Sequence, residues 1–118
     1  GMKMYIATGG MDVARYLRKV RAAPFWTRAA REWHRLYAPW VPMDTGALLN
    51  NVSFAPGQVT HHVPYARRVY GGEGMNFRRD KHPLAAPRWD LAAAKAQKPA
   101  LIRALQAYVD GGGLELKR

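Results

Sequence analysis

The most informative segment of the chain is residues 37–53, which read YAPWVPMDTGALLNNVS. Pro39 and Pro42 fix their own φ angles and push the residues before them toward extended backbone, so a preceding helix must end here. Asp44 or Thr45 is then expected to cap a new short helix, since the side-chain oxygen of either residue can accept bonds from the free N–H groups that follow. The segment therefore predicts a break between two helices.

Upstream of this break, apolar residues recur three and four positions apart. The pattern predicts an amphipathic helix that ends near residue 38, and its apolar positions are Phe25, Ala29, Trp33, Leu36 and Tyr37. Pro24 either begins this helix or interrupts an earlier one that starts near Met11, because proline is tolerated in a first helical turn. The apolar residues 3–7 form a candidate edge strand.

Downstream of the break, alternating residues predict a β-hairpin over residues 50–64, with Pro56-Gly57 as a type II turn. Pro64 ends its second strand and begins a short helix at Tyr65, which Gly71-Gly72 terminates. Residues 71–83 have no periodic apolar pattern, so they are expected to form a mobile surface loop.

The longest predicted helix runs from Trp89 to Val109, with Asp90 in its first turn. Pro99 should kink it near Lys95 or split it into two helices, because proline removes one backbone hydrogen bond and crowds the preceding turn. Residues 111–113 are all glycine and should end the helix. Residues 114–118 are expected to be disordered unless a neighbouring subunit holds them.

Composition places the chain among single-domain proteins. Its 118 residues are 48% hydrophobic, so we expect one core and one domain over residues 1–118. Cysteine is absent, which excludes disulfides and thiolate metal sites. No apolar run approaches the roughly 18 residues that a membrane span needs, and no signal peptide is visible. Gly1 ahead of Met2 is interpreted as a remnant of tag removal.

The chain is strongly basic along its whole length. It carries 19 Lys and Arg against 8 Asp and Glu, a net charge of +11. Residues 1–59 contribute 8 − 3 = +5 and residues 60–118 contribute 11 − 5 = +6. A charge of this size attracts polyanions and acidic protein surfaces alike without selecting between them.

Three blocks of the sequence, in this order, resemble the minor capsid and neck proteins of tailed bacteriophages. The first block is Val-Pro-x-Asp-Thr-Gly-x-Leu, the second is Pro-Tyr-Ala and the third is His-Pro-x-Ala-x-x-x-Trp; the resemblance covers roughly residues 33–110. Its motif residues are Asp44, Thr45, Gly46, Leu48, Pro64, Tyr65, Ala66, His82, Pro83 and Trp89.

The resemblance implies a structural virion component, a minor capsid or head-tail connector protein that acts in particle assembly without catalysis. Its implied partners are other phage structural proteins, such as portal, connector or tail proteins, and copies of itself in a ring. Its implied location is the virion, and the host cytoplasm before assembly. The resemblance also implies that His82 makes a structural hydrogen bond at the entry to the last helix.

Catalytic and metal chemistry find little support in the residues. His61 and His62 are adjacent on a predicted strand, so their side chains point to opposite faces, and His82 has no identified partner ligands. The Asp44-Thr45-Gly46 triplet occurs in aspartic proteases, but here prolines precede it and a helical stretch follows. We therefore predict no catalytic, cofactor-binding or metal site.

The alternative function is a basic nucleic-acid-binding module that uses the arginine-rich surface of residues 15–35. Aromatic residues interleaved there could stack on bases, although Tyr16 and Trp33 sit on apolar faces and more simply fill the core. The candidate contacts to DNA or to an acidic partner are Arg28, Arg31, Arg35, Arg67, Arg68, Arg78 and Arg79. For either function, the expected fold is α+β, with N- and C-terminal helices packed on a small antiparallel sheet that contains the 50–64 hairpin.

Overall fold

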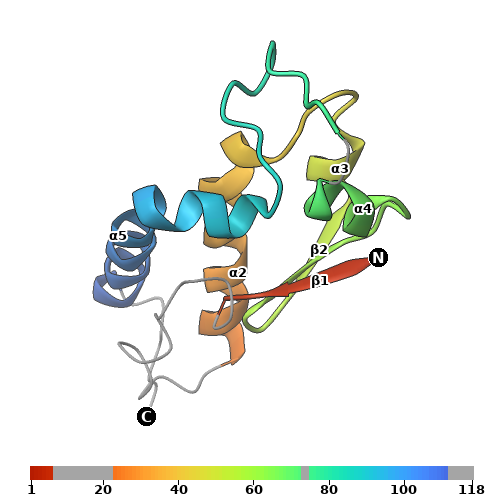
Figure 1. Cartoon of the computed structure of the whole chain (residues 1–118). Helices are drawn as coiled ribbons and strands as arrows, with labels where there is room; N and C mark the ends of the chain where they lie inside the picture. Colours follow the sequence, from red (N-terminus) through yellow and green to blue (C-terminus); the bar gives the residue numbers. More distant parts are fainter. Residues whose placement is uncertain (7–22, 73–74, 112–118) are drawn as a thin grey trace.

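The structure is a computed structural model that describes residues 1–6, 23–72 and 75–111. Its fold is α+β, as predicted: helices pack against a small antiparallel sheet (Figure 1). The elements in chain order are β1 (Met2–Tyr5), α2 (Ala23–Tyr37), the 3-10 helix η2 (Ala38–Trp40), α3 (Ala47–Asn50), β2 (Val52–Ala55), β3 (Gln58–His61), α4 (Ala66–Gly71) and α5 (Trp89–Asp110).

The sheet has the strand order β1-β3-β2, and both pairings are antiparallel. The predicted hairpin and the predicted N-terminal edge strand are therefore confirmed, since β1 supplies the third strand that a lone hairpin lacks. Gly57 has a φ of 68° in the hairpin turn, as the third position of a type II turn requires. Its N–H donates to the Trp26 carbonyl at 3.0 Å, which ties the turn to α2.

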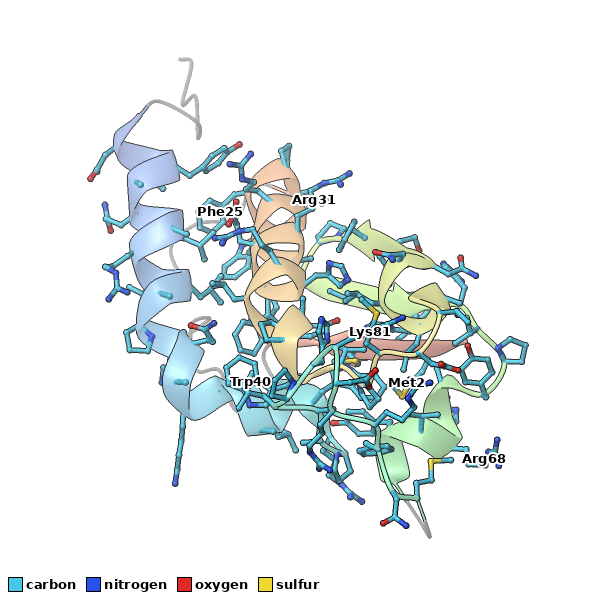
Figure 2. The ribbon with its side chains drawn as sticks, turned by 90° about the horizontal axis from the view of Figure 1, so that it is seen from above. Met2, Phe25, Arg31, Trp40, Arg68 and Lys81 are labelled. Carbon is cyan, nitrogen blue, oxygen red and sulfur yellow. The ribbon has the colours of Figure 1, made fainter. Side chains whose placement is uncertain are left out.

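Helix α2 lies at the centre of the molecule, between the sheet and α5 (Figure 1). Pro24 lies in its first turn, so this proline begins the helix. The predicted apolar stripe is confirmed, and its buried side chains are Phe25, Ala29, Ala30, Trp33, Leu36 and Tyr37. Figure 2 shows α2 and α5 running side by side, with Phe25 near the interface between them. This placement makes α2 the main contributor to the hydrophobic core formed by the described residues.

The capping expected at α3 is not formed by Asp44. Gly46 occupies the N-cap position with a φ of 93°, and no side chain of that residue can cap the helix. Thr45, the other predicted acceptor, does accept at its Oγ1 a bond from the Ala47 N–H, at 3.3 Å. The Asp44 side chain is 77% exposed and pairs with Arg78. A left-handed glycine turns the chain into α3, so the carboxylate faces solvent and cannot reach the helix N-terminus.

Helix α4 ends at Gly72, where φ is 69°. A Cβ atom on Gly72 would lie 2.6 Å from the Pro87 Cβ, so glycine is needed both for the turn and for the close approach of the chain that leads to α5. Arg88, the residue before α5, has a φ of 48°, which is unusual for a residue with a side chain. The Arg88 N–H donates to the Tyr70 carbonyl at 2.8 Å, and this bond attaches the start of α5 to α4.

Helix α5 is continuous through Pro99, so it does not split into two. The ribbon changes direction midway along its length (Figures 1 and 2), in agreement with the predicted kink. The buried apolar residues of this helix are Trp89, Ala93, Leu101 and Leu105. Ala96, midway along the helix, is exposed.

The loop between α4 and α5 is irregular over its described residues, 75–83, as predicted, and its mobility stays a prediction. The helix near Met11 with Tyr16, and the tail at 114–118, lie outside the described residues. None of the helices in the described segments combines the length and apolarity that a membrane crossing needs.

Candidate assembly surface

Three histidine rings hold the backbone of the segment that carries the first motif block. His82 Nδ1 lies 2.8 Å from the Val41 carbonyl oxygen, His61 Nδ1 lies 2.9 Å from that of Leu48, and His34 Nε2 lies 2.9 Å from that of Leu49. A carbonyl oxygen can only accept, so each of these ring nitrogens carries a proton and donates it. The rings come from α2, β3 and the loop before α5, so three separate parts of the chain hold residues 41–49 in place.

His61 is the centre of the buried polar network beneath this segment. Its Nδ1 donates to Leu48, and its Nε2 accepts from the Tyr37 hydroxyl at 2.7 Å. Both side chains are fully buried. Burial lowers the pKa of His61 to about 4 and raises that of Tyr37 well above its usual range, because neither charged form is solvated there. Both groups are therefore neutral at pH 7, and the hydrogen bond between them satisfies the buried Tyr37 hydroxyl and the buried His61 Nε2.

The third motif block packs against the same histidine. The Trp89 ring centroid lies 5.4 Å from that of His61 and 5.0 Å from that of Tyr70. The Tyr70 hydroxyl donates to Asp90 Oδ1 at 2.7 Å. Burial raises the pKa of Asp90, although the bond from Tyr70 partly opposes this shift. These contacts join α4 to the start of α5 and bring the second and third blocks together.

A groove of about 560 Å³ opens where the first and second blocks meet. Its walls are the turn before α3, helix α4 and the described residues that follow α4. The lining residues are Pro42, Met43, Asp44, Thr45, Gly46, Ala47, Leu48, Tyr65, Arg68, Val69, Met75, Asn76, Phe77 and Arg78. The groove thus contains five of the ten motif residues predicted from the sequence.

Ion pairs and hydrogen bonds tie the loop to the turn at one side of the groove. Arg78 contacts Asp44 at 3.2 Å and Asp80 at 3.0 Å, and Lys81 Nζ donates to the Asp44 carbonyl at 3.0 Å. Arg79 donates to the Ala85 carbonyl at 2.9 Å. Because the carboxylates are exposed, the ion pairs add little stability, but they place the loop beside the first block.

The motif residues, whether or not they line the groove, divide between core and surface. Leu48, Ala66 and Trp89 are buried, and Gly46 is covered. Pro64, Tyr65 and Pro83 are exposed. The buried members hold the three blocks together, and the exposed ones lie on the resulting surface.

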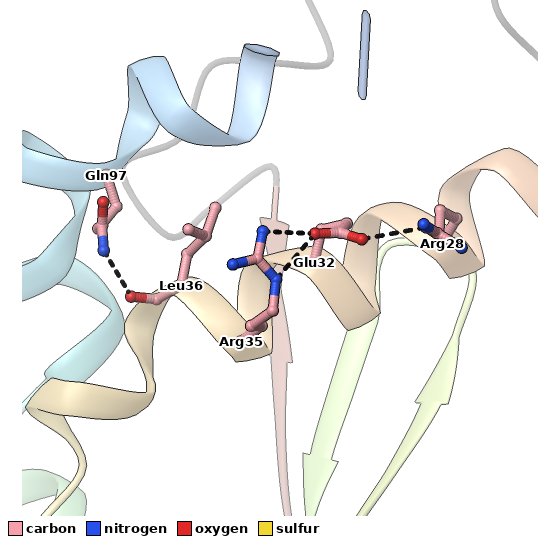
Figure 3. Close-up of polar contacts among 5 residues, drawn as sticks. All are labelled: Arg28, Glu32, Arg35, Leu36 and Gln97. Carbon is pink, nitrogen blue, oxygen red and sulfur yellow. Dashed lines mark hydrogen bonds and ion pairs between the residues drawn. The ribbon is translucent and has the colours of Figure 1, made fainter. Parts of the chain in front are cut away.

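The arginines of α2 are partly engaged within the chain (Figure 3). Glu32 accepts from Arg28 at 3.1 Å and from Arg35 at 2.7 Å. Arg31 lies over the Phe54 ring, 4.8 Å from its centroid. Farther along the helix, Gln97 of α5 donates to the Leu36 carbonyl at 3.0 Å. Residues 15–22 of the predicted arginine-rich surface lie outside the described residues, and in the described part, Glu32 stands between Arg28 and Arg35 and reduces the positive charge.

Sequence reasoning missed the polar network and the role of Glu32. The alternation of the second hairpin strand places His61 on the same face as Val59, which would have indicated an inward-facing histidine. Glu32 stands four residues after Arg28 and three before Arg35, the spacing at which helix side chains pair. The Tyr37 and Tyr70 partners are distant in sequence, so no local pattern identifies them.

Within the described segments, no three metal-binding side chains are grouped closely enough to hold an ion. His61 faces the core and His62 faces solvent, where His62 Nε2 and Ser53 Oγ share a hydrogen bond of 2.7 Å. The two adjacent histidines therefore point to opposite faces, as predicted.

The comparison with protein families identifies the class. Residues 29–107 match the family model described as minor capsid protein, and this match spans more than half of the chain. The chain therefore belongs to the minor capsid protein family, the phage family that the three motif blocks resemble. Membership gives it a structural role in the virion, in contact with other virion proteins. No curated protein and no solved structure matched the chain.

Proposed function

We propose that this minor capsid protein is a component of the connector between the phage head and tail, and that it acts during particle assembly rather than as an enzyme. The observation that carries the proposal is the convergence of the three motif blocks. His34, His61 and His82 donate to backbone carbonyls within residues 41–49, which carry the first block, and Trp89 of the third block packs against His61. A surface supported in this way suits docking, since a binding interface needs side chains held in place by the packing beneath them.

Exposed apolar side chains support an assembly role. Tyr65 is 41% exposed and Leu84 is 51% exposed, and both belong to or adjoin the motif blocks. Large apolar side chains at the surface favour protein contacts, since their burial on docking is favourable. This supports contacts with portal, connector or tail proteins.

The sheet offers a route to a homo-oligomeric ring. In the order β1-β3-β2, both β1 and β2 pair on one side with β3. The outer edges of such strands carry backbone groups that can pair with a neighbouring chain. We propose that neighbouring subunits contact one another through the strands or the hairpin tip, and that the ring forms in the particle.

The alternative is direct binding of nucleic acid through the α2 arginines. Arg31 is exposed, and the net charge of +11 favours some attraction to DNA. Glu32 opposes it, because it pairs with both Arg28 and Arg35. We therefore propose weak, sequence-independent contact with DNA at most.

Deletion of the gene in the phage genome that encodes the chain tests the connector proposal. We expect the deletion phage to produce heads and tails that do not join. Supplying the wild-type chain should restore joined particles. Intact infectious particles without the protein would contradict the proposal. For the alternative, DNA binding should be weak and should be lost with added salt. Tight DNA binding would favour the alternative instead if a triple variant, with Arg28, Arg31 and Arg35 all changed to Ala, no longer bound DNA.

A further inference from the structure

We infer that the groove between the Asp44–Leu48 turn and helix α4 is a docking site for an acidic, partly apolar segment of another virion protein. The inference rests on the proposed connector function and adds to it the surface used and the chemistry of the partner. It follows from the composition of the groove and from the pairing of its charges.

The floor of the groove is apolar. Met43, Val69, Met75 and Phe77 line it and are each only half-buried. Methionine side chains adapt their shape to a partner, and a bound segment would remove these four side chains from water. The groove therefore suits apolar side chains in the partner.

The charges around the groove are unequal. Asp44 and Asp80 are paired with Arg78, and Lys81 lies beside Asp44, so these two acids and two bases balance. Arg68 lies on the opposite wall (labelled in Figure 2) and makes no side-chain hydrogen bond or ion pair with any described residue. Among the described residues around the groove, Arg68 therefore remains available to a carboxylate.

The surplus of positive charge selects the kind of occupant. A second copy of this chain carries a net charge of +11, so an acidic segment of another protein suits Arg68 better, and we place contacts between copies at the sheet instead. Nucleic acid would bring phosphates against an apolar floor with few free cationic side chains. Binding along a phosphate backbone needs several Lys or Arg side chains. An acidic segment with apolar side chains satisfies both the floor and Arg68.

Helix α4 provides a matched pair of variants. Arg67 and Arg68 are adjacent and both exposed, but only Arg68 lines this groove, while Arg67 lines a separate hollow beside β1. Arg68→Glu and Arg67→Glu therefore change the net charge equally. We expect the copy number in purified particles to fall at least tenfold for Arg68→Glu, and to change less than threefold for Arg67→Glu, with equal melting temperatures for both purified proteins.

Photo-crosslinking identifies the occupant. Benzoylphenylalanine is placed at Tyr65, in the groove, or at Leu91, an exposed position on α5 away from it, and particles of the encoding phage are irradiated. We expect Tyr65→benzoylphenylalanine to crosslink to an Asp- or Glu-rich segment of another virion protein, and the Leu91 variant to leave that segment unlabelled.

Three results would each overturn the inference. The first is a crosslink from position 65 to DNA or to a second copy, and the second is no crosslink above the level seen from position 91. The third is an equal effect of the two arginine variants on copy number. These results would leave the connector proposal intact, provided that the unmodified protein is present in the particles. Absence of the unmodified protein from the particles would overturn both.

Discussion

Substitution of Tyr37 by phenylalanine probes the buried network on which the motif surface rests. The change removes only the hydroxyl that donates to His61 Nε2 at 2.7 Å. The His61 ring nitrogen then stays buried without a donor, which costs about 1–3 kcal/mol. For a chain of 118 residues, a loss of 1 kcal/mol lowers the melting temperature by roughly 4 °C, so we expect a decrease of about 4–12 °C.

Urea denaturation followed by circular dichroism measures this loss directly. Tyr65→Phe is the matched control, because Tyr65 is 41% exposed and water can replace any partner of its hydroxyl. We expect the control to change the free energy of unfolding by less than about 0.5 kcal/mol. A Tyr37→Phe protein as stable as the control would refute the reasoning that the hydroxyl satisfies His61.

Three further predictions concern pH, a glycine and the first motif block. The His61 pKa of about 4 in the fold lies below the value of about 6.5 in an unfolded chain, so its contribution to stability is complete above pH 6.5 and decreases as the pH falls from about 6.5 to 4. Histidine NMR should show the low pKa, and a His61 that titrates near 6.5 would contradict the described burial. Gly72→Ala should lose roughly 2–4 kcal/mol in urea denaturation, since it adds a contact with Pro87 to the strain of a positive φ. Gly57→Ala, which has the same φ strain and open space around its Cβ, should lose less, and equal losses would argue against the close approach. Asp44→Ala should lower the unfolding free energy by less than about 0.5 kcal/mol, because an exposed ion pair contributes little, whereas a loss near 1 kcal/mol would restore the capping role.

Local patterns of the sequence predict most of the elements. The spacing of apolar residues located α2 and α5, and Pro56-Gly57 located the hairpin turn. These features depend on neighbours within a few residues, where backbone preferences and periodicity act. The position of Pro24 in α2 could not be settled from the sequence, because proline is compatible with both a break and a first turn.

The details that failed depend on tertiary structure. Asp44 had the right chemistry for a cap, but the left-handed Gly46 that follows it directs the carboxylate toward Arg78, 34 residues away. The bonds from His34 and His61 join segments that are distant in the chain. The structural bond expected from His82 is present, but its partner, the Val41 carbonyl, could not be identified from the sequence because it lies 41 residues away. Such contacts appear only when the packing of α2 on the sheet is known.

Cryo-electron microscopy of purified particles of the encoding phage tests the central claim most directly. We predict density for this fold at the junction of head and tail, with the face formed by the three motif blocks against another virion protein. Density for the fold in the capsid shell away from the junction, or particles that join head to tail without the protein, would contradict the connector role.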